Sequence, residues 1–169
     1  MRKESPLRVP RFFFPGILFL AGALTVLWQN SRLAILWDLS YVMEISWRIS
    51  QGDVPYRDFV LPQSPGTFLL QALIVKAFPP YVFHIIYAAL LCGLGNVLTY
   101  FISLRLLEGR ISRANIAAFF LTLPAAFLGI YCVYPHPFYD PDTAFFILFA
   151  VWLYLRWDQQ SFRGWRGYF

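Results

Sequence analysis

The stretch YVFHIIYAALLCGLGNVLTYFISL, residues 81–104, decides the fold of this chain. It contains no Asp, Glu, Lys or Arg, and as a helix rising about 1.5 Å per residue it is long enough to cross the roughly 30 Å hydrocarbon core of a bilayer. The whole sequence agrees with this stretch, since 59% of its 169 residues are hydrophobic, 20% are aromatic and only 14% are charged. These values are typical of an all-α, polytopic membrane protein and not of an ordinary soluble domain.

Three further apolar runs, residues 12–28, 114–134 and 143–157, are candidate membrane spans. The first of them follows a basic leader, residues 1–11, as the apolar part of a signal sequence would. It is longer than the roughly 7–15 residues usual in a cleaved signal peptide, and no small-residue cleavage site follows it. We therefore expect an uncleaved signal anchor and about four transmembrane helices in all.

A shorter apolar segment, TFLLQALIVKAF at residues 67–78, would reach only about 18 Å as a helix. It also carries Lys76 and runs into Pro79 and Pro80. If this segment does not cross, ten of the fourteen Lys and Arg residues fall on one side of the membrane, whereas a crossing would turn the basic loop 105–113 outward and remove that bias. The positive-inside rule therefore predicts an interfacial or re-entrant helix on the outer side.

The resulting topology is that of a multi-pass protein of the cell (inner or plasma) membrane with both termini in the cytoplasm. It forms one membrane domain. In chain order it comprises a cytoplasmic leader (1–11), a first span (12–28), an outer loop (29–80) with helices near 38–51 and 67–78, a second span (81–104), a cytoplasmic loop (105–113), a third span (114–134), an outer loop (135–142), a fourth span (143–157) and a cytoplasmic tail (158–169).

Charge and cysteine content limit the possible partners. Six of the nine carboxylates fall in the two outer loops, so the formal net charge of +5 is mainly a topology signal, with a contribution from membrane lipid headgroups. It is not evidence for nucleic-acid binding. Cys92 and Cys132 lie in expected spans, where thiols ordinarily pack, and we assign no disulfide. Chemistry is expected in the two outer loops.

The first outer loop contains clear helix and turn signals. DLSYVMEISWRISQG, residues 38–52, is typical of an amphipathic helix that Asp38 can cap, that Glu44 and Arg48 can brace as an i,i+4 pair, and that Gly52 ends. GDVPYRDFVLPQSPG, residues 52–66, then predicts an extended, proline-punctuated connection to the next helix.

This order of features resembles the N-terminal part of the GT-C glycosyltransferases, which include the protein O-mannosyltransferases and the lipid A aminoarabinose transferases. The features are a signal anchor, an Asp shortly after it, an amphipathic helix, G-x-x-PYRDF, a Pro-Gly step into a short apolar helix, and a second outer Asp that opens a later span. The resemblance covers nearly the whole chain. It implies a membrane enzyme that transfers a sugar from a polyprenyl-phosphate donor to an acceptor hydroxyl, of unknown identity, at the outer face.

The resemblance also implies roles for individual residues. Asp38 matches the first-loop Asp, the base that takes the proton from the acceptor hydroxyl. Asp140, in FYDPDTAFF, matches the second-loop Asp at the start of a span. The stretch that shapes the acceptor side is matched by Gly52, Pro55, Tyr56, Arg57, Asp58 and Phe59.

The residues support this chemistry on physical grounds as well. Transfer from a lipid phosphate needs a carboxylate near the acceptor hydroxyl and a cation near the departing phosphate. Asp38 meets the first need, and Arg48, Arg57 and Lys76 are candidates for the second. Structural roles compete with these: Asp38 and Asp140 are well placed as helix caps, and the charges of Arg57 and Asp58 suit a solvated loop. The aromatic run 131–139 also suits an interfacial belt.

No metal or other cofactor is predicted, although His136 with Asp140 and Asp142 is a weak candidate for a divalent cation. His84, on an apolar span, is expected to be a packing residue. Enzymes of the GT-C type continue through further spans, so we expect an N-terminal fragment or a half that assembles with a second chain. The alternative functions are a non-catalytic membrane partner with the same fold and an unrelated small transporter.

Overall fold

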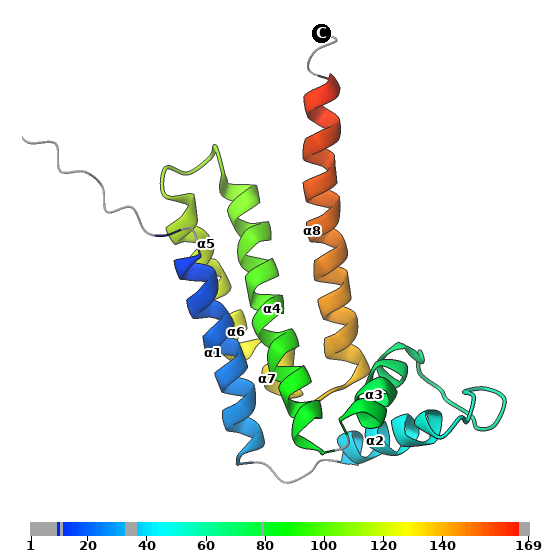
Figure 1. Ribbon diagram of the computed structural model, residues 1–169. Coiled ribbons are helices and arrows are strands. Elements are labelled where there is room, and N and C mark those ends of the chain that lie inside the picture. The colour runs from blue at the N-terminus through cyan, green and yellow to red at the C-terminus, as the bar shows by residue number, and fades with distance from the viewer. Residues whose placement is uncertain (1–9, 11, 33–36, 79, 166–169) are drawn as a thin grey trace, which may run out of the picture.

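The computed structural model describes residues 10, 12–32, 37–78 and 80–165, and within them it contains helices and loops but no β-strand (Figure 1). The prediction of an all-α chain is confirmed. The predicted leader, apart from residue 10, and the last four residues of the predicted tail lie outside the described residues. The helices are α1 (Phe13–Asn30), α2 (Trp37–Ser50), α3 (Gly66–Ala77), α4 (Val82–Leu107), α5 (Ala114–Thr122), α6 (Ala125–Leu128), α7 (Ile130–Val133) and α8 (Tyr139–Trp165).

The long helices run along the molecule and two shorter ones lie across one end of it (Figure 1). α1 packs against α4, and α4 also contacts α5 and α8. α2 and α3 pack against each other beside the C-terminal end of α1 and the N-terminal ends of α4 and α8. Segments from both predicted outer loops therefore gather at this one end.

Two helices, α1 and α4, are long and apolar enough to cross a membrane. They nearly coincide with the predicted spans 12–28 and 81–104. α2 and α3 begin and end within a residue or so of the helices predicted at 38–51 and 67–78, and α3 is among the apolar helices too short to meet the length of a span. Apolar run length is a local property of the sequence, which is why these boundaries could be predicted.

The predicted third span, residues 114–134, is not one continuous helix. α5 ends at Thr122, Pro124 precedes α6, and Gly129 separates α6 from α7. Pro124 has no amide hydrogen to donate to the preceding turn. Gly129 is extended, with a ψ of 170°, and a Cβ at this position would collide with the carbonyl oxygen of Ala125. The prediction of a span at residues 114–134 is therefore not confirmed by a single helix of membrane length.

The last helix is longer than the predicted fourth span, residues 143–157. α8 begins at Tyr139 and continues to Trp165, so it takes in part of the predicted outer loop and part of the predicted tail. Asp140 and Asp142 lie in its first turn. Carboxylates are favourable there because the unpaired amide groups at a helix N-terminus carry partial positive charge.

Small residues allow α1 and α4 to approach closely. Ala23 and Val26 of α1 are buried against Ala88, Ala89 and Cys92 of α4. A Cβ added to Gly93 would lie 2.6 Å from Cδ2 of Phe19 and 3.0 Å from its carbonyl oxygen. At Gly95, two residues further along α4, the nearest atom would be 4.0 Å away.

We expect Gly93→Ala to lower the thermal unfolding temperature of the detergent-solubilised protein, because the added methyl group forces α1 away from α4. Overpacking of this kind costs about 1–3 kcal/mol. Gly95→Ala is the matched control, since it adds the same methyl group at an ordinary van der Waals distance of 4.0 Å from Cδ2 of Phe145 and gains up to about 1 kcal/mol of helix propensity. Equal unfolding temperatures for the two variants would contradict the close approach at Gly93.

Candidate functional site

The two predicted outer loops meet in an aromatic cluster. Val42 and Ile45 of α2, Leu61, Phe68 of α3 and Phe138 are its buried members. Partly buried side chains pack around them: Tyr41, Ile49, Phe59, Tyr134 and Tyr139. The rings of Tyr41 and Phe68 meet edge to face with centroids 5.7 Å apart, and those of Tyr134 and Phe138 stack at 5.4 Å. This cluster joins residues 41–68 to residues 134–139.

The last turn of α1 holds the segment that leads into α8. Nε2 of Gln29 donates to the carbonyl oxygen of Cys132 at 2.8 Å, and Nδ2 of Asn30 donates to that of Pro135. Polar side chains at the end of α1 thereby satisfy carbonyl groups at the end of α7 and in the segment between α7 and α8. The position of the residues before α8 is thus tied to α1 as well as to α2 and α3.

Asp38 and Asp140 both lie exposed in the first turn of a helix at this end of the molecule. α2 begins at Trp37, so Asp38 is inside the first turn and is not the cap residue that the sequence predicts. Asp140 directly follows Tyr139 of the aromatic cluster. The structure therefore brings together the two segments that carry these carboxylates, although about a hundred residues separate them in the chain.

His136 lies between these segments, and its side chain is only 1% exposed. Burial lowers the pKa of His136, while the charge of Asp38 acts in the opposite direction and raises it. The imidazole is therefore neutral at pH 7. Its Nε2 has no hydrogen-bond partner among the residues that the structure describes. The electrostatic influence of Asp38 on His136 is not visible in the sequence.

The proposed cation site around His136, Asp140 and Asp142 finds no counterpart in the structure. Within the described parts of the chain, no three His, Cys, Asp or Glu side chains come together in a group that could hold a metal ion. Asp140 is exposed, whereas Asp142 is buried and accepts a hydrogen bond at 3.1 Å from the hydroxyl of Tyr87. The two carboxylates therefore face different surroundings.

A set of buried polar side chains links α3, α4 and α8 behind the exposed acids. Nδ1 of His84 and Oε1 of Gln71 are 2.6 Å apart, and both side chains are fully buried. Tyr87, one turn after His84 on α4, makes the bond to Asp142 of α8. The signal for this set in the sequence is Gln71, a lone amide within the apolar run TFLLQALIVKAF. Its partners could not be named without the fold.

The charged residues at the end of α2 and in the loop after it form ion pairs with one another. Gly52, with a φ of +108°, ends the helix as predicted and turns the chain so that Asp53 lies 2.9 Å from Nε of Arg48. The guanidinium of Arg48 also lies 4.5 Å from the centroid of the Phe59 ring. Arg48 thus pairs with Asp53, and the predicted pairing with Glu44 is wrong because the turn at Gly52 brings a better-placed carboxylate.

The PYRDF stretch forms a tight turn in which Pro55 and Phe59 make an isolated bridge. Arg57 holds Asp58 through two hydrogen bonds of 2.9 and 2.8 Å. Together with the amide of Val54, which donates to Asp58 at 2.7 Å, this contact lowers the pKa of Asp58 to about 2. Asp58 therefore stays ionised far below neutral pH, and its contribution to the turn is lost only as the pH falls toward that value.

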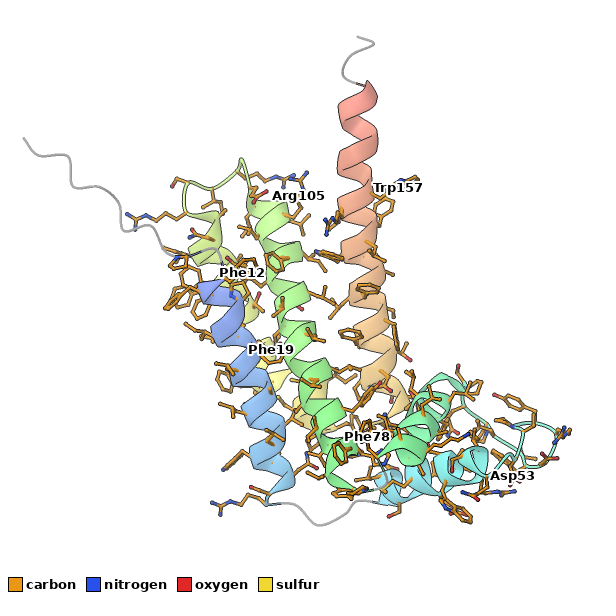
Figure 2. The ribbon with its side chains drawn as sticks, viewed as in Figure 1. Phe12, Phe19, Asp53, Phe78, Arg105 and Trp157 are labelled. Atoms are coloured by element: carbon orange, nitrogen blue, oxygen red, sulfur yellow. The ribbon has the colours of Figure 1, made fainter. Side chains whose placement is uncertain are left out.

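Two further candidates are Tyr56, which lies within this turn, and Lys76, which lies on α3. Tyr56 adopts a positive φ of 67°, and its hydroxyl donates to the carbonyl oxygen of Gln63 at 2.7 Å. Lys76 is exposed in the last turn of α3, close in sequence to Phe78, which Figure 2 shows beside the start of α4.

Among known proteins, no family model, no curated protein and no solved structure matches this chain.

Proposed function

We propose that this chain is a membrane glycosyltransferase of the GT-C type, or the N-terminal part of one, that moves a sugar from a polyprenyl-phosphate donor to an acceptor hydroxyl at the outer membrane face. The observation that carries the proposal is that the aromatic cluster brings the segment of Asp38 to the segment of His136 and Asp140, where the charge of Asp38 acts on the buried imidazole. An exposed carboxylate beside a buried neutral imidazole suits proton transfer from a hydroxyl group.

In the proposed reaction Asp38 takes the proton from the acceptor hydroxyl. The oxygen then forms a bond to the anomeric carbon as the bond between that carbon and the phosphate oxygen breaks, and polyprenyl phosphate departs. Asp140 accepts hydrogen bonds from sugar hydroxyl groups. His136 holds the Asp38 carboxylate in place, since its burial keeps it from moving with the solvent-exposed loop.

Lys76 is the cation that we assign to the departing phosphate. Arg48 and Arg57 each hold a carboxylate of their own loop, whereas within the described residues Lys76 makes no ion pair. A flexible ammonium group at the end of a surface helix can follow a phosphate as its charge develops. The turn formed by Tyr56, Arg57 and Asp58 then shapes the acceptor side and does not neutralise the donor.

Four spans with both termini in the cytoplasm remain our proposed topology. It is supported by the alternating directions of α1, α4, the α5–α7 segment and α8 in Figure 1 and by the charge distribution of the sequence. It is also supported by the outward faces of these helices, which expose large apolar side chains as a lipid environment requires. Examples are Leu20, Leu24, Leu90, Leu94, Phe120, Phe146 and Ile147.

Single cysteines test this topology. In a background with Cys92→Ala and Cys132→Ala, Ser64→Cys is expected to react with an impermeant thiol reagent added to intact cells, and Ser112→Cys only after the membrane is opened. Both serines are exposed in the structure, so a difference in labelling reports the side of the membrane and not burial. Labelling of both positions in intact cells would overturn the four-span arrangement.

The function itself is tested by transfer from a radiolabelled polyprenyl-phosphate hexose or pentose in native membranes that do or do not contain the chain. We expect labelled acceptor to accumulate faster when the chain is present. If transfer needs the chain but proceeds equally well with Asp38→Asn, Asp38 is not the base of the reaction. If no donor sugar is transferred in either preparation, the glycosyltransferase proposal fails.

A further inference from the structure

A cavity of about 700 Å³ lies at the end of the molecule opposite to α2 and α3. It is bounded by the start of α1, the C-terminal part of α4, the start of α5 and the later turns of α8. In Figure 2 the labels Phe12, Arg105 and Trp157 mark this end, and Phe78 and Asp53 mark the other. The cavity is therefore separate from the candidate site of sugar transfer.

One wall of the cavity is apolar. Phe14 of α1, Tyr100, Phe101 and Leu104 of α4, and Trp152 and Leu155 of α8 form it. This wall does not favour a small hydrophilic ligand, because the apolar surface would remain in contact with water when such a ligand is bound. The volume lies within the range of sites that take a ligand of drug size.

The remaining wall is polar and mainly basic. It consists of Arg105, Glu108, Asn115 and Arg156. Arg156 lies with its guanidinium carbon 5.3 Å from the centroid of the Trp152 ring, and Nη1 of Arg105 lies 3.4 Å from Oε2 of Glu108. A guanidinium that stacks on a ring still offers the N–H groups at its edge. Among the described side chains of this wall, two guanidinium groups lie beside one carboxylate with an amide nearby, an arrangement that favours an anion.

We propose that this cavity binds an anionic phospholipid, with the lipid phosphate at Arg105 and Arg156 and an acyl chain along the aromatic and aliphatic wall. Guanidinium groups bind phosphate oxygens in a bidentate manner, and the hydrophobic effect favours the chain in contact with Trp152, Leu155 and Phe101. The same site joins α4 to α8 through the bound lipid.

Two features favour a lipid over a free phosphate. Exposed apolar side chains continue outward from the cavity on both neighbouring helices, Leu106 on α4 and Leu153 on α8, so a lipid chain can reach it from the bilayer. In the proposed topology the cavity lies at the cytoplasmic side of the membrane, where anionic lipids concentrate. The lipid site depends on membrane insertion and not on sugar transfer.

The test is native mass spectrometry of the detergent-solubilised full chain after exchange with equal amounts of phosphatidylglycerol and phosphatidylcholine. We expect the wild-type protein to retain phosphatidylglycerol in preference. Arg105→Gln with Arg156→Gln should lower this retention about tenfold or more, since both charge-assisted contacts to the lipid phosphate are lost. Arg110→Gln with Arg113→Gln, which removes the same charge from the loop beside the cavity, should change it less than about twofold.

A second variant separates the cavity from surface charge. Leu155→Trp places a larger side chain in the space beside the apolar wall and leaves both guanidinium groups in place. It should also reduce retention of phosphatidylglycerol. Added inorganic phosphate should not displace the lipid. The proposal is overturned if the two double variants lose lipid equally, if Leu155→Trp retains lipid fully, if phosphatidylcholine is retained as well as phosphatidylglycerol, or if inorganic phosphate displaces the lipid.

Discussion

Asp38→Asn is expected to slow sugar transfer by about 10² to 10⁴ fold, the range for losing a positioned general base. Asparagine has the size of aspartate but cannot take the proton of the acceptor hydroxyl. Because Asp38 lies in the first turn of α2, the change also removes a favourable charge at the helix N-terminus, which costs about 0.3–1 kcal/mol. The measurement is the initial rate of transfer in native membranes, with thermal unfolding as the check on folding.

Asp53→Asn and Asp58→Asn are the matched controls for this prediction. The ion pair of Asp53 with Arg48 is partly exposed, with side chains 40% and 34% accessible, so its loss should change transfer little. Asp58→Asn should act only through the shape of the PYRDF turn and reduce transfer less than Asp38→Asn does. Full transfer activity in Asp38→Asn would remove this residue from the role of base.

A readout that does not depend on activity accompanies the Asp38 variant. The carboxylate of Asp38 raises the pKa of His136 against the effect of burial, so Asp38→Asn should lower the pKa of His136 further. Titration of the histidine resonances by NMR measures this shift, with His84→Gln used to assign the second histidine. An unchanged pKa of His136 would show that the two side chains are not coupled.

Phe68→Ala is expected to lower the free energy of unfolding by about 3–5 kcal/mol, the cost of emptying a fully buried aromatic position. Phe68 has no exposed surface, meets Tyr41 edge to face and belongs to the aromatic cluster that includes Phe138. Its loss should loosen α3 from α2 and from the segment before α8. Sugar transfer should fall as well, because the two segments that carry Asp38 and Asp140 would no longer be held together.

Leu69→Ala provides the comparison on the same helix. Leu69 is 46% exposed, and substitutions at such positions usually change stability by no more than about 0.5 kcal/mol. Chemical unfolding followed by near-ultraviolet circular dichroism measures both variants under one set of conditions. A similar loss of stability for Phe68→Ala and Leu69→Ala would contradict the aromatic cluster as the link between the two segments.

Local signals in the sequence were sufficient for much of the helical framework. The apolar run at residues 81–104 predicts α4, and the shorter run at 67–78 predicts α3, because the length of an apolar run depends only on neighbouring residues. Gly52 predicts the end of α2, since a left-handed backbone conformation after a helix favours glycine. Pro124 is also a signal in the sequence, but a proline in an apolar run is compatible with either a kinked helix or two separate helices. The structure has two helices, α5 and α6, at this point.

The sequence by itself determined an all-helical chain, and of the four spans that it predicts, two are helices with the length and composition to cross a membrane. Only the tertiary structure decided that His136 is buried where the charge of Asp38 reaches it, that Gln71 meets His84, and that Arg48 pairs with Asp53. The reason is physical. Helix formation follows from residues three or four apart, whereas contacts between one helix and a following turn or another helix depend on how these elements pack. The aromatic cluster around Phe68 sets the packing of the segments that carry Asp38 and His136.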